Sequence, residues 1–173
     1  MANKTKIYVG GPFTFFYKDY TPELLKTDFR YKLIGNDFAK QTSKTVIVGN
    51  AEYVGPFYYY QLGQTPHDVV VSEINAVRNA DNVYLVFSEK GNAPGTVAEL
   101  IHAAVLNKKL NIYYVESNIE TEATISGNLC DNINHPYWYP FIQAKTLATN
   151  VKFTKCKTFN EATNKCLADI ANL

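Results

Sequence analysis

The fold is decided by residues 73 to 104, E-I-N-A-V-R-N-A-D-N-V-Y-L-V-F-S-E-K-G-N-A-P-G-T-V-A-E-L-I-H-A-A. The centre of this segment, Val83 to Phe87, is a continuous apolar run rich in β-branched and aromatic residues. Such a run is typical of a strand covered on both faces of a parallel sheet. A glycine-bearing loop from Ser88 to Gly95 follows, and apolar residues then recur at helical spacing. The segment predicts a strand, a loop and a helix, which make half of a βαβ unit.

Glu99 is expected in the first turn of that helix, with Thr96 as the capping residue. Loops at the carboxyl ends of parallel strands bind ligands in α/β folds, so this carboxylate would face the predicted pocket. A structural interpretation stands beside the functional one. Residues 96 to 99 also fit a capping box, in which the glutamate bonds back to the amide of the cap residue.

The rest of the chain alternates in the same way. We expect strands at residues 7–9, 45–48, 83–87, 111–115 and 151–154, and helices that start near Thr21, Thr65, Thr96, Phe141 and Thr158. The first helix is expected to run to about Lys32. This alternation predicts a parallel sheet with helices on both faces, and right-handed crossovers favour the strand order 2-1-3-4-5. The predicted architecture is a single α/β domain spanning residues 1–173, a five-stranded parallel, Rossmann-like (flavodoxin-like) three-layer sandwich.

Aromatic residues are unusually frequent, with 13 Tyr, 10 Phe and one Trp. Gly11-Pro12-Phe13 and Gly55-Pro56-Phe57 each follow a predicted strand and are each followed by more aromatic residues. Two such loops on one edge of the sheet could hold a planar ring between them. They could equally cover the sheet or form a subunit interface, where Tyr and Phe are also enriched.

Composition argues against several classes of function. A net charge of +1 provides no broad electrostatic footprint for nucleic acid or an anionic membrane. The three cysteines lie in no C-x-x-C pair and the three histidines have no ligand spacing, so we expect reduced thiols and no metal. The N-terminus lacks the apolar region of a signal peptide and no run reaches membrane-spanning length. We therefore expect a soluble, cytoplasmic protein.

Several motifs in order resemble the nucleoside 2-deoxyribosyltransferase family. They are I-Y-V-G-G-P-F at residues 7 to 13, Glu73 eight residues before Asp81, and G-T-V-A-E-L at residues 95 to 100 with Ala103. The resemblance covers roughly residues 6 to 116. It implies an enzyme that transfers 2-deoxyribose between nucleobases by cleaving the N-glycosidic bond, as in nucleotide salvage.

The resemblance also implies roles for particular residues. Glu99 would be the nucleophile that forms a covalent deoxyribosyl ester, Glu73 would assist proton transfer to the base, and Tyr8 would lie near the nucleophile. This is the physical logic of retaining glycosidases. The substrate-binding residues expected from the resemblance and from the aromatic loops are Gly10, Gly11, Phe13, Phe16, Phe57, Tyr58, Asp81, Asn92, Gly95 and Asn128.

No cofactor is expected. The expected partners are a nucleoside or nucleotide, a free nucleobase and further copies of the chain, with a dimer as the building unit of a homo-oligomer. Two alternatives stay open. The protein could be an N-glycosidase that hydrolyses deoxynucleosides or their 5′-monophosphates, although the loop after the first strand contains no arginine. It could also be a non-catalytic protein that binds and sequesters nucleotides.

Overall fold

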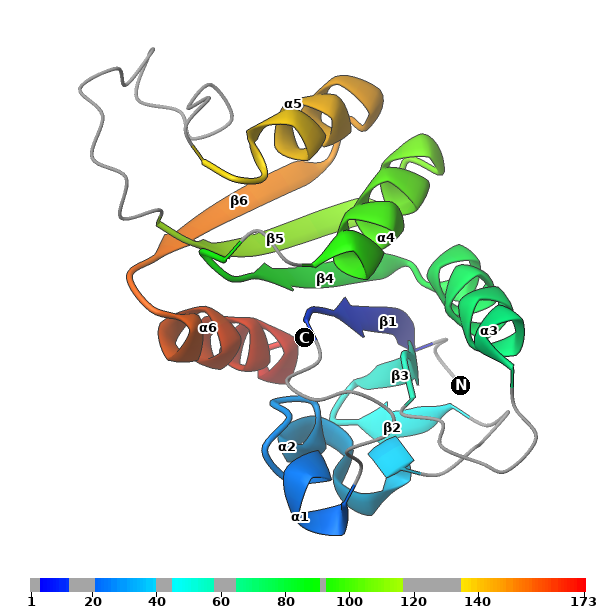
Figure 1. Cartoon of the computed structure of the whole chain (residues 1–173). Coiled ribbons are helices and arrows are strands. Elements are labelled where there is room, and N and C mark those ends of the chain that lie inside the picture. Colours follow the sequence, from blue (N-terminus) through cyan, green and yellow to red (C-terminus); the bar gives the residue numbers. More distant parts are fainter. Residues whose placement is uncertain (1–3, 13–20, 40–44, 58–64, 91–92, 117–134) are drawn as a thin grey trace.

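The computed structural model describes residues 4–12, 21–39, 45–57, 65–90, 93–116 and 135–173. Its strands form one six-stranded sheet in the order β2-β3-β1-β4-β5-β6 (Figure 1). The strand bounds are β1 Thr5–Gly10, β2 Val46–Val48, β3 Ala51–Gly55, β4 Asn82–Phe87, β5 Lys109–Val115 and β6 Val151–Cys156. All neighbouring pairs are parallel except β2 with β3. The chain is thus an α/β protein with a mostly parallel, Rossmann-like sheet.

The prediction of five strands in the order 2-1-3-4-5 is wrong. The expected second strand, β2, pairs antiparallel with an extra strand, β3, which separates it from β1. Gly49 adopts a φ of +57° in the short connection between β2 and β3, a conformation that glycine adopts without steric penalty. The expected contact between the first strand and the strand at Val83 to Phe87 is confirmed, because β1 pairs with β4.

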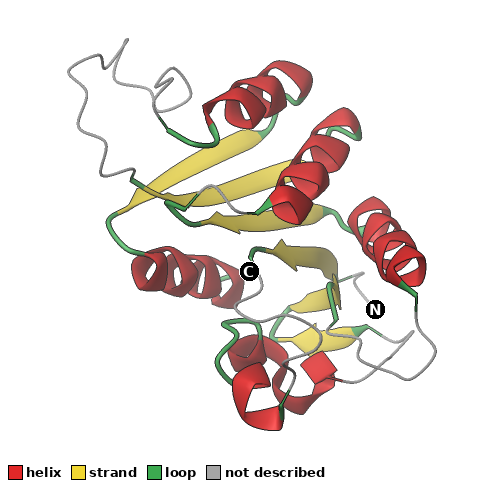
Figure 2. Ribbon diagram, viewed as in Figure 1, coloured by secondary structure: helices red, strands yellow, loops and turns green. Residues whose placement is uncertain are grey.

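Helices cover both faces of the sheet (Figures 1 and 2). Their bounds are α1 Pro22–Leu25, α2 Tyr31–Ile34, the 3-10 helix η2 Gly35–Ala39, α3 Pro66–Asn79, α4 Pro94–Val105, α5 Trp138–Leu147 and α6 Phe159–Ala171. One core packs α3, α4 and α5 against the sheet, and a second core packs α1, α2, η2 and α6 against its other face. Among the described helices, none is long and apolar enough to span a bilayer.

The expected starts of two helices are confirmed at atomic detail. Thr65 caps α3 through a reciprocal capping box with Asp68, and Thr158 caps α6 by accepting the Glu161 amide hydrogen. The continuous helix expected from Thr21 to about Lys32 is wrong. Helix α1 stops after one turn, and a bend separates it from α2. A buried ion pair between Asp28 and Arg30 occupies the bend, and Arg30 also donates to the distant Gly11 carbonyl oxygen, a tertiary contact that local helix propensity does not include.

Phe141 on α5 is the centre of an aromatic cluster beneath the α3, α4 and α5 layer. It is fully buried, and its ring centroid lies 5.0 Å from that of Phe87 and 5.4 Å from that of Phe153. We expect Phe141→Ala to lower the free energy of unfolding by about 3–5 kcal/mol, because it leaves a cavity in a packed core. Urea denaturation measures this change. Tyr139→Ala on the same helix is the control, since Tyr139 is 62% exposed, and a loss of about 1 kcal/mol or less is expected.

Candidate active site

Glu99 lies in the second turn of α4, one turn later than expected. The helix begins at Pro94 after the N-cap residue Ala93, so Thr96 is a buried residue inside the helix and not its cap. The capping-box interpretation of Glu99 is therefore wrong, because a capping glutamate must stand three residues after the N-cap. Helix capping does not account for this carboxylate.

The start of α4 is held by a distant tyrosine. The hydroxyl of Tyr137 accepts a hydrogen bond from the Ala93 amide at 3.1 Å, in place of the side-chain cap that the helix lacks. The ring centroid of Tyr137 lies 4.8 Å from that of Phe87. The Tyr137 backbone amide donates a hydrogen bond to Nδ1 of His135. Sequence analysis missed this contact, because the two residues are 44 positions apart.

The Glu99 carboxyl group packs on the last residue of β1. A Cβ built on Gly10 would overlap Glu99 Oε2 and would lie 2.6 Å from Leu85 Cδ2 and 3.2 Å from Tyr8 Cε1. Only a glycine therefore fits between the carboxylate and the strand. The structure brings together three of the predicted site residues here: Tyr8, Gly10 and Glu99.

Glu73 completes the group from α3. It lines a cavity of about 20 Å³ together with residues 54 to 57, Ser72 and Ala76. The Tyr8 ring lies beside the same segment, because a Cβ built on Gly55 would be 3.5 Å from Tyr8 Cε2. Two carboxyl groups from different helices thus flank one buried tyrosine at the carboxyl end of β1.

The electrostatics of this group favour protonated acids. Burial, and next the charge of Glu73, raise the pKa of Glu99 to about 8, while the Tyr8 hydroxyl and Arg30 act in the opposite direction. Burial also raises the pKa of Glu73, against the effect of Arg30. Burial and the two carboxylates raise the pKa of Tyr8, so its hydroxyl keeps its proton. Perturbation by burial and a like charge is typical of functional carboxyl groups.

Two polar atoms of this group lack partners. Among the described residues, neither the Tyr8 hydroxyl nor Glu99 Oε2 makes a hydrogen bond of normal geometry, although both atoms are buried and the Tyr8 hydroxyl is near enough to lower the pKa of Glu99. Leaving such a group unpaired costs about 1–3 kcal/mol. Residues selected for stability alone avoid this cost, so the arrangement indicates a site that binds or transforms a ligand.

The other predicted contact residues lie in different surroundings. Gly11 is buried against the Phe29 ring, Phe57 is buried with its ring centroid 5.3 Å from that of Tyr53, and Gly95 lies exposed in the first turn of α4. Phe57 also lines the small cavity beside Glu73. The predicted contacts at Phe13, Phe16, Tyr58, Asn92 and Asn128 lie outside the described residues.

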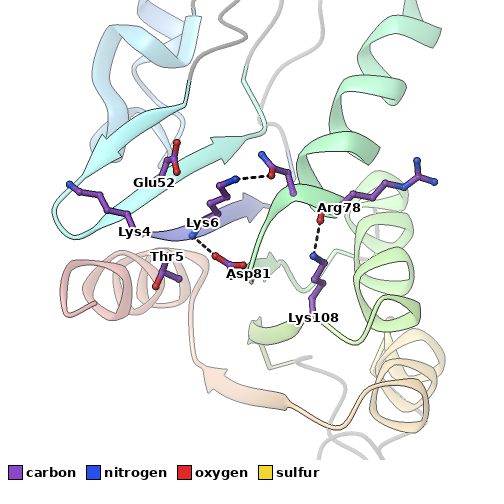
Figure 3. Close-up of a pocket in the computed structure, with 8 residues that line it drawn as sticks. Lys4, Thr5, Lys6, Glu52, Arg78, Asp81 and Lys108 are labelled. Carbon is purple, nitrogen blue, oxygen red and sulfur yellow. Dashed lines mark hydrogen bonds between the residues drawn. The ribbon is translucent and has the colours of Figure 1, made fainter. Parts of the chain in front are cut away.

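Asp81 is not part of this group. It precedes β4 at the amino end of the strands, whereas Glu99 packs on the carboxyl end of β1. Its Oδ2 accepts a hydrogen bond from the Lys6 amide at 2.8 Å (Figure 3), which joins β1 to the start of β4. It lines a polar cleft of about 550 Å³ with Lys108 and other residues at that edge. The structure therefore does not bring Asp81 together with Glu99, and its described contact joins β1 to β4.

Arg30 belongs to the site and was missed by sequence analysis. It is fully buried, pairs with Asp28, and donates through Nη1 to the Gly11 carbonyl oxygen at 3.2 Å. No local pattern predicts a buried arginine, because the sequence of the bend that contains Arg30 has the pattern of a helix. Among the described residues, no group of three His, Cys, Asp or Glu side chains could hold a metal ion.

Comparisons with known proteins add the following. No protein-family model matches the chain, and no curated protein matches it. One of the solved structures that resemble it is the CMP N-glycosidase BcmB of Clostridium botulinum, at 20% sequence identity and a TM-score of 0.40. The similarity covers 58% of this chain and 72% of that chain. A likeness of this size carries no conclusion about activity, which has to follow from the site residues.

The contact between Gly10 and Glu99 yields a prediction. We expect Gly10→Ala to lower the free energy of unfolding by about 1–3 kcal/mol, because the new methyl group overlaps Glu99 Oε2 and Leu85. Thermal denaturation measures the loss. Gly95→Ala is the control, since a Cβ there meets nothing within 4 Å, and it should leave stability unchanged or raise it. Equal stability of the wild type and Gly10→Ala would contradict the close approach.

The raised pKa of Glu99 yields a second prediction. Because the pKa of Glu99 is higher in the folded than in the unfolded state, its contribution to the free energy of unfolding is fully present below about pH 4.5. This contribution is lost as the pH rises to about 8 and the carboxyl loses its proton. We therefore expect Glu99→Gln to gain stability relative to the wild type across this window, by up to about 1.4 kcal/mol per pH unit. Urea denaturation at several pH values measures the difference.

Other titrating groups cancel in that comparison. Burial lowers the pKa of His135, which makes both proteins lose stability as the pH falls. Because Glu99→Gln leaves His135 untouched, the difference between the two curves reports Glu99 together with its coupling to Glu73. Parallel curves from pH 4.5 to 8 would show that Glu99 titrates as an ordinary surface acid.

Proposed function

We propose that the protein is a nucleoside 2-deoxyribosyltransferase that cleaves an N-glycosidic bond through a covalent ester on Glu99. The observation that supports this proposal best is the Glu99 carboxyl, which packs on Gly10 beside Tyr8 and near a second, half-buried acid, Glu73. Two carboxyl groups with different surroundings are the usual equipment for breaking a glycosidic bond with retention.

The proposed reaction has two displacements. The Glu99 carboxylate attacks the anomeric carbon of a deoxynucleoside, the bond to the base breaks, and Glu73 gives its proton to the departing base nitrogen. A second base then attacks the anomeric carbon, its proton passes to the Glu73 carboxylate, and the ester bond to Glu99 breaks. Each step develops positive charge on the sugar, which the adjacent carboxylate stabilises.

The proton inventory fits this sequence. Both acids have raised pKa values, so at neutral pH the pair retains a proton that a leaving base can take. The larger rise in pKa is at Glu99, so this proton resides on Glu99 in the free protein, and the reaction requires it to move to Glu73 when the substrate binds. The Tyr8 hydroxyl stays protonated and can donate to a Glu99 oxygen, which favours this movement of the proton.

The arginines favour a substrate without a phosphate. The chain contains two of them, Arg30 and Arg78. Arg30 is fully buried and engaged with Asp28, and Arg78 lines the cleft at the amino edge of the sheet. Neither can supply a bidentate clamp for a phosphate bound at Glu99. Transfer between unphosphorylated nucleosides therefore suits the site better than hydrolysis of nucleoside 5′-monophosphates.

The remaining parts of the proposal concern binding and assembly. Phe57 and the aromatic residues that follow it would contact the base, and Asn128 would come from a second copy of the chain in a homo-oligomer. We propose that residues 1–173 act as one catalytic domain in the cytoplasm. No cofactor enters the proposed reaction.

Incubation with a deoxynucleoside and a different free base, followed by chromatography, tests the proposal. We expect a new deoxynucleoside from the wild type, and a fall of at least about 10³-fold for Glu99→Ala, because no other side chain would form the ester. Substrates with and without a 5′-phosphate are compared. Glu23→Gln is the control, since Glu23 is an exposed acid in α1.

Other products would overturn the proposal in specific ways. Free deoxyribose without a new nucleoside would assign hydrolysis, and binding without any product would assign sequestration. A Glu99→Ala variant that keeps full activity would remove Glu99 from the reaction. Mass spectrometry of protein quenched during turnover should detect one added deoxyribosyl group on the wild type and none on the variant.

A further inference from the structure

The Arg30 side chain is held by hydrogen bonds and by contacts with two aromatic rings. Its Nε and Nη2 donate to the two carboxylate oxygens of Asp28 at 2.8 and 2.6 Å, and its backbone amide donates to the same carboxylate at 2.9 Å. The guanidinium lies 5.1 Å from the Phe29 ring centroid and 5.3 Å from that of Phe38. Such a bidentate pair between two rings has little freedom to move.

The pair is oriented with respect to the acids. Asp28 binds the Nε and Nη2 edge, while Nη1 donates to the carbonyl oxygen of Gly11, the residue after the glycine on which Glu99 rests. The positive end of the pair is therefore directed at the turn after β1, and the negative end is directed away from it. An oriented pair of this kind acts on nearby charges although its net charge is zero.

We propose that Arg30 is a positioning residue for the Glu73 and Glu99 acid pair, acting through the Gly10-Gly11 turn from the opposite face of the sheet. Arg30 belongs to the core that packs α1, α2 and η2, whereas Glu99 reaches Gly10 from α4 on the other side. The Gly10-Gly11 turn is thus contacted from both faces of the sheet. The inference deepens the proposed function, on which its catalytic part rests.

Energetics favour a functional role over a purely structural one. Replacing a buried ion pair by apolar residues of similar volume is often neutral or stabilising, so stability alone is a weak reason for the pair. In the part of the chain that the structure describes, the charged or titratable groups that face Glu99 are Tyr8, Glu73 and Arg30. Of these, Arg30 carries positive charge, and it opposes the rise in pKa that burial causes at both glutamates.

Two variants separate charge from geometry. Asp28→Leu/Arg30→Met removes the pair but keeps apolar volume, and Arg30→Lys keeps the charge but loses the fork. The first readout is the pH midpoint of Glu99, followed by NMR of carboxyl-labelled glutamate without any substrate. The second readout is kcat and KM for base exchange.

We expect the double variant to raise the Glu99 midpoint by roughly half a pH unit. A single charge at about 10 Å, with an effective dielectric of about 20, shifts a pKa by about one unit. The shift expected here is smaller, because Asp28 offsets part of the charge of Arg30. Arg30→Lys should leave the midpoint unchanged, and both variants should lower kcat at least about tenfold with little change in KM, because the nucleophile is displaced. Tyr113→Phe is the matched control.

Tyr113→Phe breaks a hydrogen bond of 2.6 Å to Asp169 on the same face of the sheet and leaves the turn after β1 untouched. It should change neither readout. A folded double variant with the wild-type midpoint and kcat would overturn the proposal. If that variant does not fold, Arg30→Lys decides, and wild-type kcat in that variant would overturn it. Should the wild type show no turnover, the midpoint still tests Arg30, and the proposed function fails separately.

Discussion

The site depends on the burial of the Glu99 carboxyl against Gly10. A carboxylate inside a protein is disfavoured unless it is paired, and a second acid nearby makes its ionisation harder still. The structure nevertheless places Glu99 and Glu73 around the buried ring of Tyr8. The Tyr8 hydroxyl and Arg30 offset only part of this penalty, so the rest of the fold has to hold the group together.

Two cores provide that support. One packs α3, α4 and α5 on the face that carries both acids, and its aromatic cluster anchors α4 through Tyr137 and Ala93. The other packs α1, α2, η2 and α6 on the opposite face, where Arg30 holds the Gly11 carbonyl. The turn at the end of β1 lies where the two meet, because Glu99 packs on Gly10 and Arg30 binds the Gly11 carbonyl oxygen.

Sequence patterns predicted local elements well where they contained their own signals. Thr65-Pro66 and Thr158 predicted the starts of α3 and α6, and the apolar run at residues 83 to 87 predicted β4. They failed where distant contacts decide. Strand β3 was read as part of an aromatic loop, although the Gly49-Asn50 turn between two short apolar runs was a signal for a hairpin. The bend at Asp28 had no local signal, because the burial of its ion pair and the contact of Arg30 with Gly11 depend on packing against β1.

By itself the sequence determined the α/β class and the pairing of β1 with β4, because hydrophobic periodicity is a property of the chain alone. The two acids were expected from the resemblance of several motifs to a known family. Tertiary structure decided the surroundings of Glu99 and Glu73. It excluded the helix-cap interpretation of Glu99 and buried its Oε2 atom, which raises the pKa to about 8, placed Asp81 at the far edge of the sheet, and brought Arg30 to the turn. Burial and charge proximity arise from packing between segments far apart in sequence, which no local pattern encodes.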